Sequence, residues 1–190
     1  MELVGQYRDK GLYDCILPYS GGKDSVFQLW YVVRKLGLKP LVVRFDHWFY
    51  RPLVEENNTS VFKQLGVDVL NFTPNWHVVR ELMLESLKRR GDFCWHCHTG
   101  IYAHTMQIAI RYETPLLIWG ESLAEYQSFY SYDEMEEVDE KRFNRAMNLG
   151  ITADDIPHIR QIGAIPVLNT PKQIALWRAA GGGRCHVMLD

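Results

Sequence analysis

The sequence contains no apolar run that approaches the roughly 20 residues a membrane-spanning helix requires. Its start, residues 1–10, is polar and charged and lacks the apolar core of a secretory signal peptide. It also lacks a large excess of basic residues, since the formal net charge is −2, and this argues against a dedicated nucleic-acid binder. We therefore expect a cytoplasmic protein that does not associate with a membrane.

Cysteines are few: Cys15, Cys94, Cys97 and Cys185. In the expected reducing compartment they should not form a disulfide framework. Internal repeats and low-complexity segments are absent, and the hydrophobic fraction of 47 % and charged fraction of 23 % are those of a folded globular chain. We expect a single domain over residues 1–180 and a flexible tail over residues 181–190, which opens on three glycines.

Short apolar segments alternate with helical patterns along the first 120 residues. Buried strands are predicted at residues 13–18, 40–45, 67–72 and 115–119, and helices at residues 1–12, 24–36, 53–65, 75–90 and 100–111. Further along, we interpret residues 126–142 as a solvated helix or an excursion over the site, and residues 165–168 as a fifth strand. The alternation predicts an α/β fold with a doubly wound, mostly parallel five-stranded sheet and helices on both faces.

The strongest motif is the run SGGKDS between the first predicted strand and the helix that follows it. Its glycines permit a tight turn with positive φ, and they let backbone N–H groups converge on an anion at the positive end of the helix. The serine hydroxyls can donate hydrogen bonds, Lys23 can neutralise phosphate charge, and Asp24 is placed to help hold Mg²⁺. The predicted phosphate ligands are Ser20, Gly21, Gly22, Lys23, Asp24 and Ser25.

Two other phosphate-binding loops are excluded, since neither GxxxxGK[ST] nor GxGxxG follows the strand. The alternative without a ligand is a glycine-rich turn capped by serine and aspartate. The six residues match the SGGxDS signature, and the chain resembles the PP-loop ATP pyrophosphatases, which share an adenine nucleotide alpha hydrolase-like fold. The resemblance implies cleavage of ATP between its α- and β-phosphates, with pyrophosphate in the loop and AMP carried by a co-substrate. The nucleotide is then expected at the carboxyl ends of the strands.

Neighbouring strand ends should line the nucleotide pocket of such a sheet. Backbone groups near Phe45 are expected to contact the adenine edge, Asp46 to face the ribose or the second substrate, and His47 to be a surface loop residue. After the fourth strand, Gly120 permits close approach to the site. We expect Glu121 to be a Mg²⁺ ligand or a carboxylate that orients the reactants; the alternative is an acidic residue exposed in a loop. The predicted catalytic residues are Lys23, Asp24 and Glu121.

A second motif places Cys94 and Cys97 next to His96 and His98. A C-x₂-C pair chelates one ion well, and thiolates with imidazoles suit Zn²⁺, so the two cysteines are the predicted metal ligands. They make half of a structural site, whose other ligands would be the two histidines, the remaining cysteines or a segment outside this sequence. The pattern C-x-x-C-H also occurs at c-type haem attachment sites, which require export. The last alternative is a reduced, metal-free pair.

Over residues 1 to about 151, the chain resembles the N-acetyl sugar amidotransferases of lipopolysaccharide O-antigen biosynthesis. The matching segments are YDCILPYSGGKDS, VVRFDHWF, NNTSVFKQLGVDV, GDFCWHCHTGIYAHTMQIAI and PLLIWGES. Membership implies that an acetamido group of a nucleotide-activated sugar is adenylated and converted by ammonia into an acetamidino group. It also implies that a separate glutamine amidotransferase and its barrel-shaped, synthase-like companion supply the ammonia. Family proteins are longer and carry a cysteine-containing segment before the PP-loop, so we expect a fragment or a truncated copy.

Two other functions stay open at this point. PP-loop tRNA-thiolating enzymes also combine SGGKDS with C-x₂-C, which there holds an iron–sulfur cluster. They need a basic surface for RNA, which the pI near 6.4 does not favour. A non-catalytic nucleotide-binding module of the same fold is the other alternative, and the intact Lys23, Asp24 and Ser25 argue against it.

Overall fold

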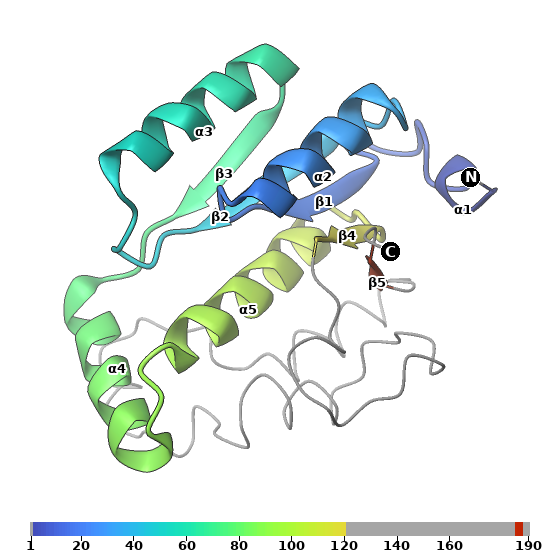
Figure 1. Cartoon of the computed structure of the whole chain (residues 1–190). Helices are drawn as coiled ribbons and strands as arrows, with labels where there is room; N and C mark the ends of the chain where they lie inside the picture. The colour runs from blue at the N-terminus through green and yellow to red at the C-terminus, as the bar shows by residue number, and fades with distance from the viewer. Residues whose placement is uncertain (1, 121–184, 188–190) are drawn as a thin grey trace.

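The computed structural model describes residues 2–120 and 185–187, and Figure 1 shows the arrangement of their elements. The strands are β1 (Cys15–Pro18), β2 (Pro40–Phe45), β3 (Asp68–Phe72), β4 (Leu117–Trp119) and β5 (Cys185–Val187). The helices are α1 (Glu2–Gly5), α2 (Lys23–Arg34), α3 (Pro52–Leu65), α4 (Trp76–Arg90) and α5 (Trp95–Arg111). Strands and helices therefore alternate over the first 120 residues, as the sequence predicts.

All described strands pair in parallel, in the order β3-β2-β1-β4-β5. β1 is buried along its whole length because it is paired on both sides, with Ile16 opposite Leu41 of β2 and Leu117 of β4. The chain winds outward from β1 to β2 and β3 and then returns to place β4 on the other side of β1. The carboxyl ends of β1 and β4 are thus the point at which the strand order reverses, where open α/β sheets bind ligands.

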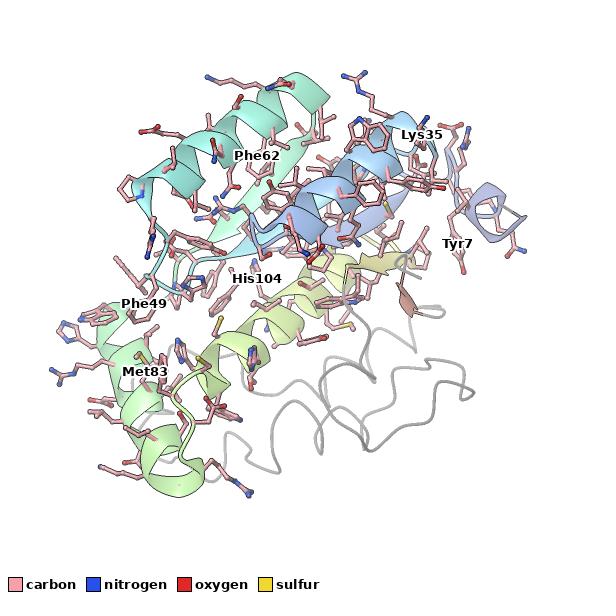
Figure 2. All side chains as sticks on the ribbon, in the orientation of Figure 1. Tyr7, Lys35, Phe49, Phe62, Met83 and His104 are labelled. Carbon is pink, nitrogen blue, oxygen red and sulfur yellow. The ribbon has the colours of Figure 1, made fainter. Side chains whose placement is uncertain are left out.

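Helices cover both faces of this sheet, in two core layers. The layer under α5 comprises Ile16, Leu41, Val43, Tyr102, Met106, Ile108, Ala109, Leu117 and Trp119. The layer under α2 comprises Cys15, Leu17, Tyr19, Leu29, Val32, Leu36, Leu38, Val42, Leu116 and Ile118, and α3 packs against it through residues that include Phe62 (Figure 2). Successive strand residues point to opposite faces, so consecutive residues of β1 belong to different layers. The predicted parallel α/β sheet with helices is confirmed.

Helix ends follow signals in the local sequence. α3 ends at Gly66 and α4 at Gly91, both in the left-handed conformation, with φ values of 67° and 70°. Asn75 caps the start of α4, where its side chain accepts a hydrogen bond from the N–H of His77 at 2.9 Å. These three ends agree with the predicted boundaries to within a residue.

Two helix boundaries differ from the prediction by more than two residues. The first helix stops at Gly5 and not at residue 12, since Asp9 takes a left-handed φ of 56° and donates its N–H to the Asp14 carboxylate at 2.6 Å. α5 begins before the predicted residue 100, and the cysteine segment forms its first turn instead of a loop. The N–H of Cys97 donates to the carbonyl of Cys94 at 2.9 Å, which closes that turn.

Strand β5 lies within residues 181–190, for which the sequence predicts a flexible tail. Its three residues pair with β4, with His186 opposite Ile118, so this part of the tail is an edge strand instead. The fifth strand predicted at residues 165–168 and the segment 126–142 lie outside the described residues. Across residues 2–120 and 185–187, no helix has the length and apolar character needed to cross a bilayer.

Candidate active site

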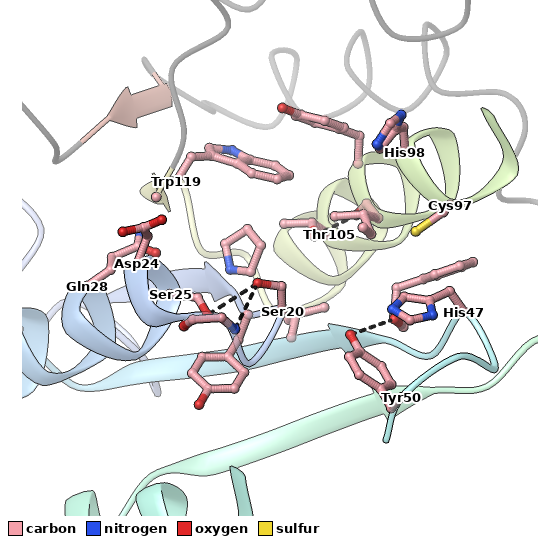
Figure 3. A pocket seen from close by; sticks show the side chains of 18 residues that line it. Ser20, Asp24, Ser25, Gln28, His47, Tyr50, Cys97, His98, Thr105 and Trp119 are labelled. Carbon is pink, nitrogen blue, oxygen red and sulfur yellow. Dashed lines mark hydrogen bonds between the residues drawn. The ribbon is translucent and has the colours of Figure 1, made fainter. Parts of the chain in front are cut away.

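A cavity of about 310 Å³ lies at the carboxyl edge of the sheet. Its lining comes from the SGGKDS loop with the start of α2, the end of β2 with the loop after it, α5 between residues 97 and 105, and the ends of β1 and β4. Figure 3 shows the lining side chains from these segments around the cavity. The segments are far apart in the sequence, so the reversal of strand order between β1 and β4 is what assembles this site.

The phosphate loop turns sharply at Gly21, whose φ of 85° is readily adopted only by glycine. Gly22 has an extended backbone, with φ −76° and ψ 168°, so the positive φ predicted for the loop glycines holds for one of the two. Gly22 is the N-cap of α2 and offers no side-chain cap. The first N–H groups of a helix have no intrahelical acceptor, and here they are therefore available to an anion.

Two serine hydroxyls hold the loop in shape. Oγ of Ser25 accepts from the N–H of Gly21 at 3.1 Å and donates to the carbonyl of Gly22 at 3.0 Å. Oγ of Ser20 accepts from the N–H of Gly22 at 3.4 Å and donates to Oγ of Ser25 at 3.3 Å. A phosphate oxygen is a stronger, charged acceptor than a hydroxyl. Phosphate can therefore replace the serine oxygens on these amides, and the hydroxyls can then donate to it. The loop fits the group that the sequence predicts for it.

Lys23 and Asp24 face solvent at the start of α2. The side chain of Lys23 is 91 % exposed and that of Asp24 is 56 % exposed, and Nζ of Lys23 lies 3.9 Å from Oδ1 of Asp24. An exposed ion pair contributes only about 0–1 kcal/mol to stability, so both charges can serve a ligand at little energetic cost. Asp24 lines the cavity, whereas Lys23 does not and would have to turn its side chain to reach a phosphate there.

A polar network supports the loop from the α3 side. The Tyr19 hydroxyl donates to Oδ1 of Asn58 at 3.2 Å, and Nδ2 of Asn58 donates to Oε1 of Glu55 at 3.4 Å. Glu55 also accepts two hydrogen bonds from the Arg44 guanidinium, at 3.0 and 2.5 Å. The Arg44 side chain is 7 % exposed and lies over the ring of Tyr50, 5.0 Å from its centroid. The network therefore joins β2 to α3 and ends in two tyrosines that line the cavity.

The protonation states in this network follow from its contacts. The hydrogen bonds from Arg44 lower the pKa of the Glu55 carboxyl. Burial raises the pKa of Tyr19 to about 12 and also raises the pKa of Tyr50. At neutral pH the network accordingly contains an ionised carboxylate, a guanidinium and two neutral phenols, and each hydrogen bond has one donor and one acceptor.

The end of β2 and the loop after it border the cavity. Phe45 lines the cavity, whereas Asp46 does not, and both carboxylate oxygens of Asp46 accept hydrogen bonds from nearby segments of the chain. Oδ1 accepts from the N–H of Trp48 at 2.8 Å and Oδ2 accepts from the Thr73 hydroxyl at 3.2 Å. His47, predicted as a surface loop residue rather than a ligand, is a half-buried loop residue that lines the cavity, and burial lowers its pKa. The contact of Asp46 with a ribose or second substrate stays a prediction.

Aromatic rings form the wall of the cavity beside β4. Trp119 stacks on Tyr102 of α5, with ring centroids 4.1 Å apart and an interplanar angle of 21°. Gly120 lines the cavity next to them, and the buried side chain of Gln28 reaches it from α2. Glu121, the predicted catalytic carboxylate, lies outside the described residues.

One of the two cysteines lines the cavity and the other does not. Cys94 is the N-cap of α5 and does not line the cavity, whereas Cys97 and the adjacent His98 do. Burial raises the pKa of both thiols, that of Cys97 to about 12. Within the part of the chain that the structure describes, no group of three or more His, Cys, Asp or Glu side chains is arranged to hold a metal ion. Zinc at Cys94 and Cys97 therefore stays a prediction from the sequence.

The cavity brings together Ser20, Gly22, Asp24, Ser25, Phe45, Cys97 and Gly120 from the predicted set. Gly21, Lys23, Asp46 and Cys94 do not line it. The two sequence motifs did not include the lining residues Gln28, Tyr50, Tyr102 and Thr105. These four side chains belong to no local pattern, because only the packing of the helices and loops against the sheet brings them to the cavity.

Comparison with known proteins adds little to this geometry. No family model matches the chain. An uncharacterised protein of Methanocaldococcus jannaschii is 29 % identical over 116 residues, which are 61 % of this chain and 41 % of that protein. The chain therefore spans less than half the length of the curated relative that it matches.

Three solved structures are similar in outline. A predicted subunit of tRNA methyltransferase from Methanocaldococcus jannaschii is 18 % identical, with a TM-score of 0.43, over 77 % of this chain and 73 % of that one. An NH3-dependent NAD synthetase from Campylobacter jejuni is 11 % identical, with a TM-score of 0.48 over 100 % and 95 % of the two chains. An NMN synthetase from Francisella tularensis is 12 % identical, with a TM-score of 0.45 over 100 % and 95 %. Structural similarity at these identities and TM-scores says nothing about function. The chemistry of the site is therefore inferred from its own residues.

Proposed function

We propose that this protein is an ATP-cleaving enzyme of the PP-loop type, which transfers AMP to a second substrate and releases pyrophosphate. The observation that carries the proposal is the setting of the SGGKDS loop. Ser20, Gly22 and the uncapped start of α2 line the cavity at the reversal of strand order, next to the turn at Gly21. The loop amides would hold the β- and γ-phosphates there, since the N-terminus of a helix favours anions.

Charged groups at the loop suit this chemistry. Lys23 is exposed and mobile enough to turn onto the departing pyrophosphate, whose charge it would stabilise. Asp24 is the acidic residue of the loop that lines the cavity, and its carboxylate is the candidate Mg²⁺ ligand among the described residues. When bound, Mg²⁺ supplies charge neutralisation on the phosphate oxygens.

The second substrate that the sequence supports best is a nucleotide-linked sugar with an acetamido group. Its carbonyl oxygen attacks the α-phosphorus, the bond to the β-phosphate oxygen breaks, and loss of the N–H proton leaves an O-adenylyl imidate with pyrophosphate. Ammonia then adds to the imidate carbon, the carbon–oxygen bond breaks, and AMP departs with the former amide oxygen to leave an acetamidino group. We further propose that a separate glutamine amidotransferase and its synthase-like companion supply the ammonia.

Apolar walls favour such an intermediate. An adenylate is hydrolysed wherever water reaches it, so the site must exclude solvent during the reaction. Tyr102 and Trp119 are each 7 % exposed, and Phe45 is 6 % exposed at the opposite side of the loop. These three rings line the cavity, so their apolar surfaces would replace water around a bound adenylate.

A substrate screen tests the proposal. Pyrophosphate release from ATP is measured with ammonia and either UDP-linked acetamido sugars or bulk tRNA. We expect release with the sugars, together with a product in which mass spectrometry detects NH in place of oxygen. Release with tRNA alone would replace sugar amidation by the tRNA-modifying alternative, and release with neither would remove both.

A further inference from the structure

Gln28 is a buried amide whose orientation is fixed by its neighbours. It lies in α2, one turn beyond Asp24, and is 1 % exposed. Its Nε2 donates to the carbonyl of Ile118 in β4 at 2.8 Å. Because a carbonyl can only accept, the nitrogen must face β4 and the oxygen must face the other way.

The oxygen of this amide is turned toward Gly120. A Cβ atom on Gly120 would lie 2.8 Å from Oε1 of Gln28, compared with 3.9 Å from its Nε2. Gln28 and Gly120 both line the cavity. A side chain at position 120 would therefore press on the acceptor, whereas glycine avoids this clash.

Oε1 of Gln28 has no hydrogen-bond partner among the described residues. Buried polar atoms are almost always paired, and an unpaired one lowers stability. A carbonyl oxygen that is buried, held in orientation and turned toward a cavity is suited to accept a hydrogen bond from a ligand. The ligand must then present an N–H or O–H donor at the β4 end of the cavity.

We propose that Oε1 of Gln28 accepts a hydrogen bond from the amide N–H of the second substrate, an inference that rests on the function proposed above. Gln28 and Asp24 are four residues apart in α2 and so share one face of the helix. An acetamido group whose N–H meets Gln28 can point its carbonyl oxygen toward the phosphate loop, where the α-phosphorus is expected.

The same hydrogen bond would assist the reaction. An acceptor on the amide N–H polarises the amide and increases the electron density on its carbonyl oxygen, the atom that attacks phosphorus. Gln28 takes up no proton, since an amide is not a base at neutral pH. It is therefore a substrate-orienting residue that also distinguishes an amide from an ester.

The test compares two ligands that differ in one donor. Binding is measured for a UDP-linked 2-acetamido sugar and for the same molecule with a 2-O-acetyl ester, in which oxygen replaces NH. We expect the wild-type protein to bind the ester about tenfold more weakly. In Gln28→Met, amide binding should fall to the level of the ester, while the ester affinity stays unchanged.

Gln64→Met is the matched control, because Gln64 is an exposed amide of α3 bonded to Ser60 at 2.9 Å. It should keep the wild-type ratio of the two affinities. Equal affinities of the wild-type protein for amide and ester would overturn the inference and would leave Oε1 to a bound water. The ratio of the two wild-type affinities needs no variant, so it tests the inference even if Gln28→Met fails to fold. The affinity ratio can also be measured without turnover. Absence of pyrophosphate release would contradict the proposed function, whereas equal affinities for amide and ester would contradict only the role of Gln28.

Discussion

Gly21 of the phosphate loop lies directly against the side chain of Asn58 in α3. A Cβ atom on Gly21 would be 2.7 Å from Oδ1 and 2.9 Å from Nδ2 of Asn58. Asn58 is 1 % exposed, and its amide is held by the Tyr19 hydroxyl and the Glu55 carboxylate. The loop therefore needs glycine at this position both for its φ of 85° and for this close contact.

Gly21→Ala should distort the loop and destabilise the protein by roughly 2 kcal/mol or more, because it adds backbone strain to a steric clash. ATP-dependent pyrophosphate release should fall with it. Gly22→Ala is the matched control: Gly22 has a negative φ, and a Cβ there would meet only Oγ of Ser20, at an ordinary 3.5 Å. Chemical denaturation should show a cost below about 1 kcal/mol for the control. Equal costs for the two variants would contradict this account of the turn.

Lys23→Ala should lower the rate of pyrophosphate release by about 10²–10³-fold, as expected for removal of one charge from a departing anion. Its thermal stability should stay unchanged, since the Lys23 side chain is 91 % exposed. Lys35→Ala makes the same change beyond the far end of α2, where Lys35 lies over the ring of Trp30 (Figure 2). The Lys35→Ala protein should release pyrophosphate at the wild-type rate. Wild-type rates for Lys23→Ala would exclude this lysine from the mechanism.

Glu55→Gln should destabilise the protein at neutral pH by about 1–3 kcal/mol, because it leaves the buried Arg44 with a weaker, neutral acceptor. The hydrogen bonds from Arg44 lower the pKa of Glu55 in the folded state. Its ionised form is therefore favoured by folding, and the contribution is complete above the unfolded pKa of about 4.3 and is lost as the pH falls further. Denaturation of both proteins across this range should show the stability difference shrinking in acid. A pH-independent difference would count against the ion pair.

The fold was largely predictable because its strands are short apolar segments bounded by turn residues. β2 lies at the predicted residues, and the glycines after α3 and α4 mark both helix ends correctly. The start of α5 was not predictable in this way. Cysteine, tryptophan and histidine have no strong helix preference, and the burial of Trp95 and His96 in the folded chain draws this segment into the helix.

The site was predictable where backbone geometry defines it and unpredictable where tertiary packing does. The phosphate loop is a local pattern, so its residues could be named from the sequence. Gln28 gave no signal, because a polar residue inside a helix is usually solvated, and only the approach of β4 shows that it is buried. The hydrogen bonds of Asp46 could not be predicted either, because one of them comes from Thr73 after β3, which only the folded sheet brings next to the loop after β2.

Replacement of both Cys94 and Cys97 by serine tests the predicted zinc site. If the pair holds zinc, elemental analysis of the wild-type protein should detect the metal, and the double variant should lose it together with thermal stability. A chelator should lower the melting temperature of the wild-type protein only. Cys15→Ser is the control for metal content, because Cys15 lies in the core layer under α2 and not under α5, and this variant should keep the metal. A metal-free wild-type protein with an unaffected double variant would support the reduced pair.

The phosphorus products of ATP are the most direct test of the central claim, that the SGGKDS loop holds the leaving pyrophosphate. Phosphorus NMR of a reaction with ATP, Mg²⁺, ammonia and a UDP-linked acetamido sugar identifies every product without a coupling enzyme. The account predicts AMP and pyrophosphate in equal amounts, with both formed about 10²–10³-fold more slowly by Lys23→Ala. ADP with orthophosphate, or unchanged ATP under all conditions, would contradict it.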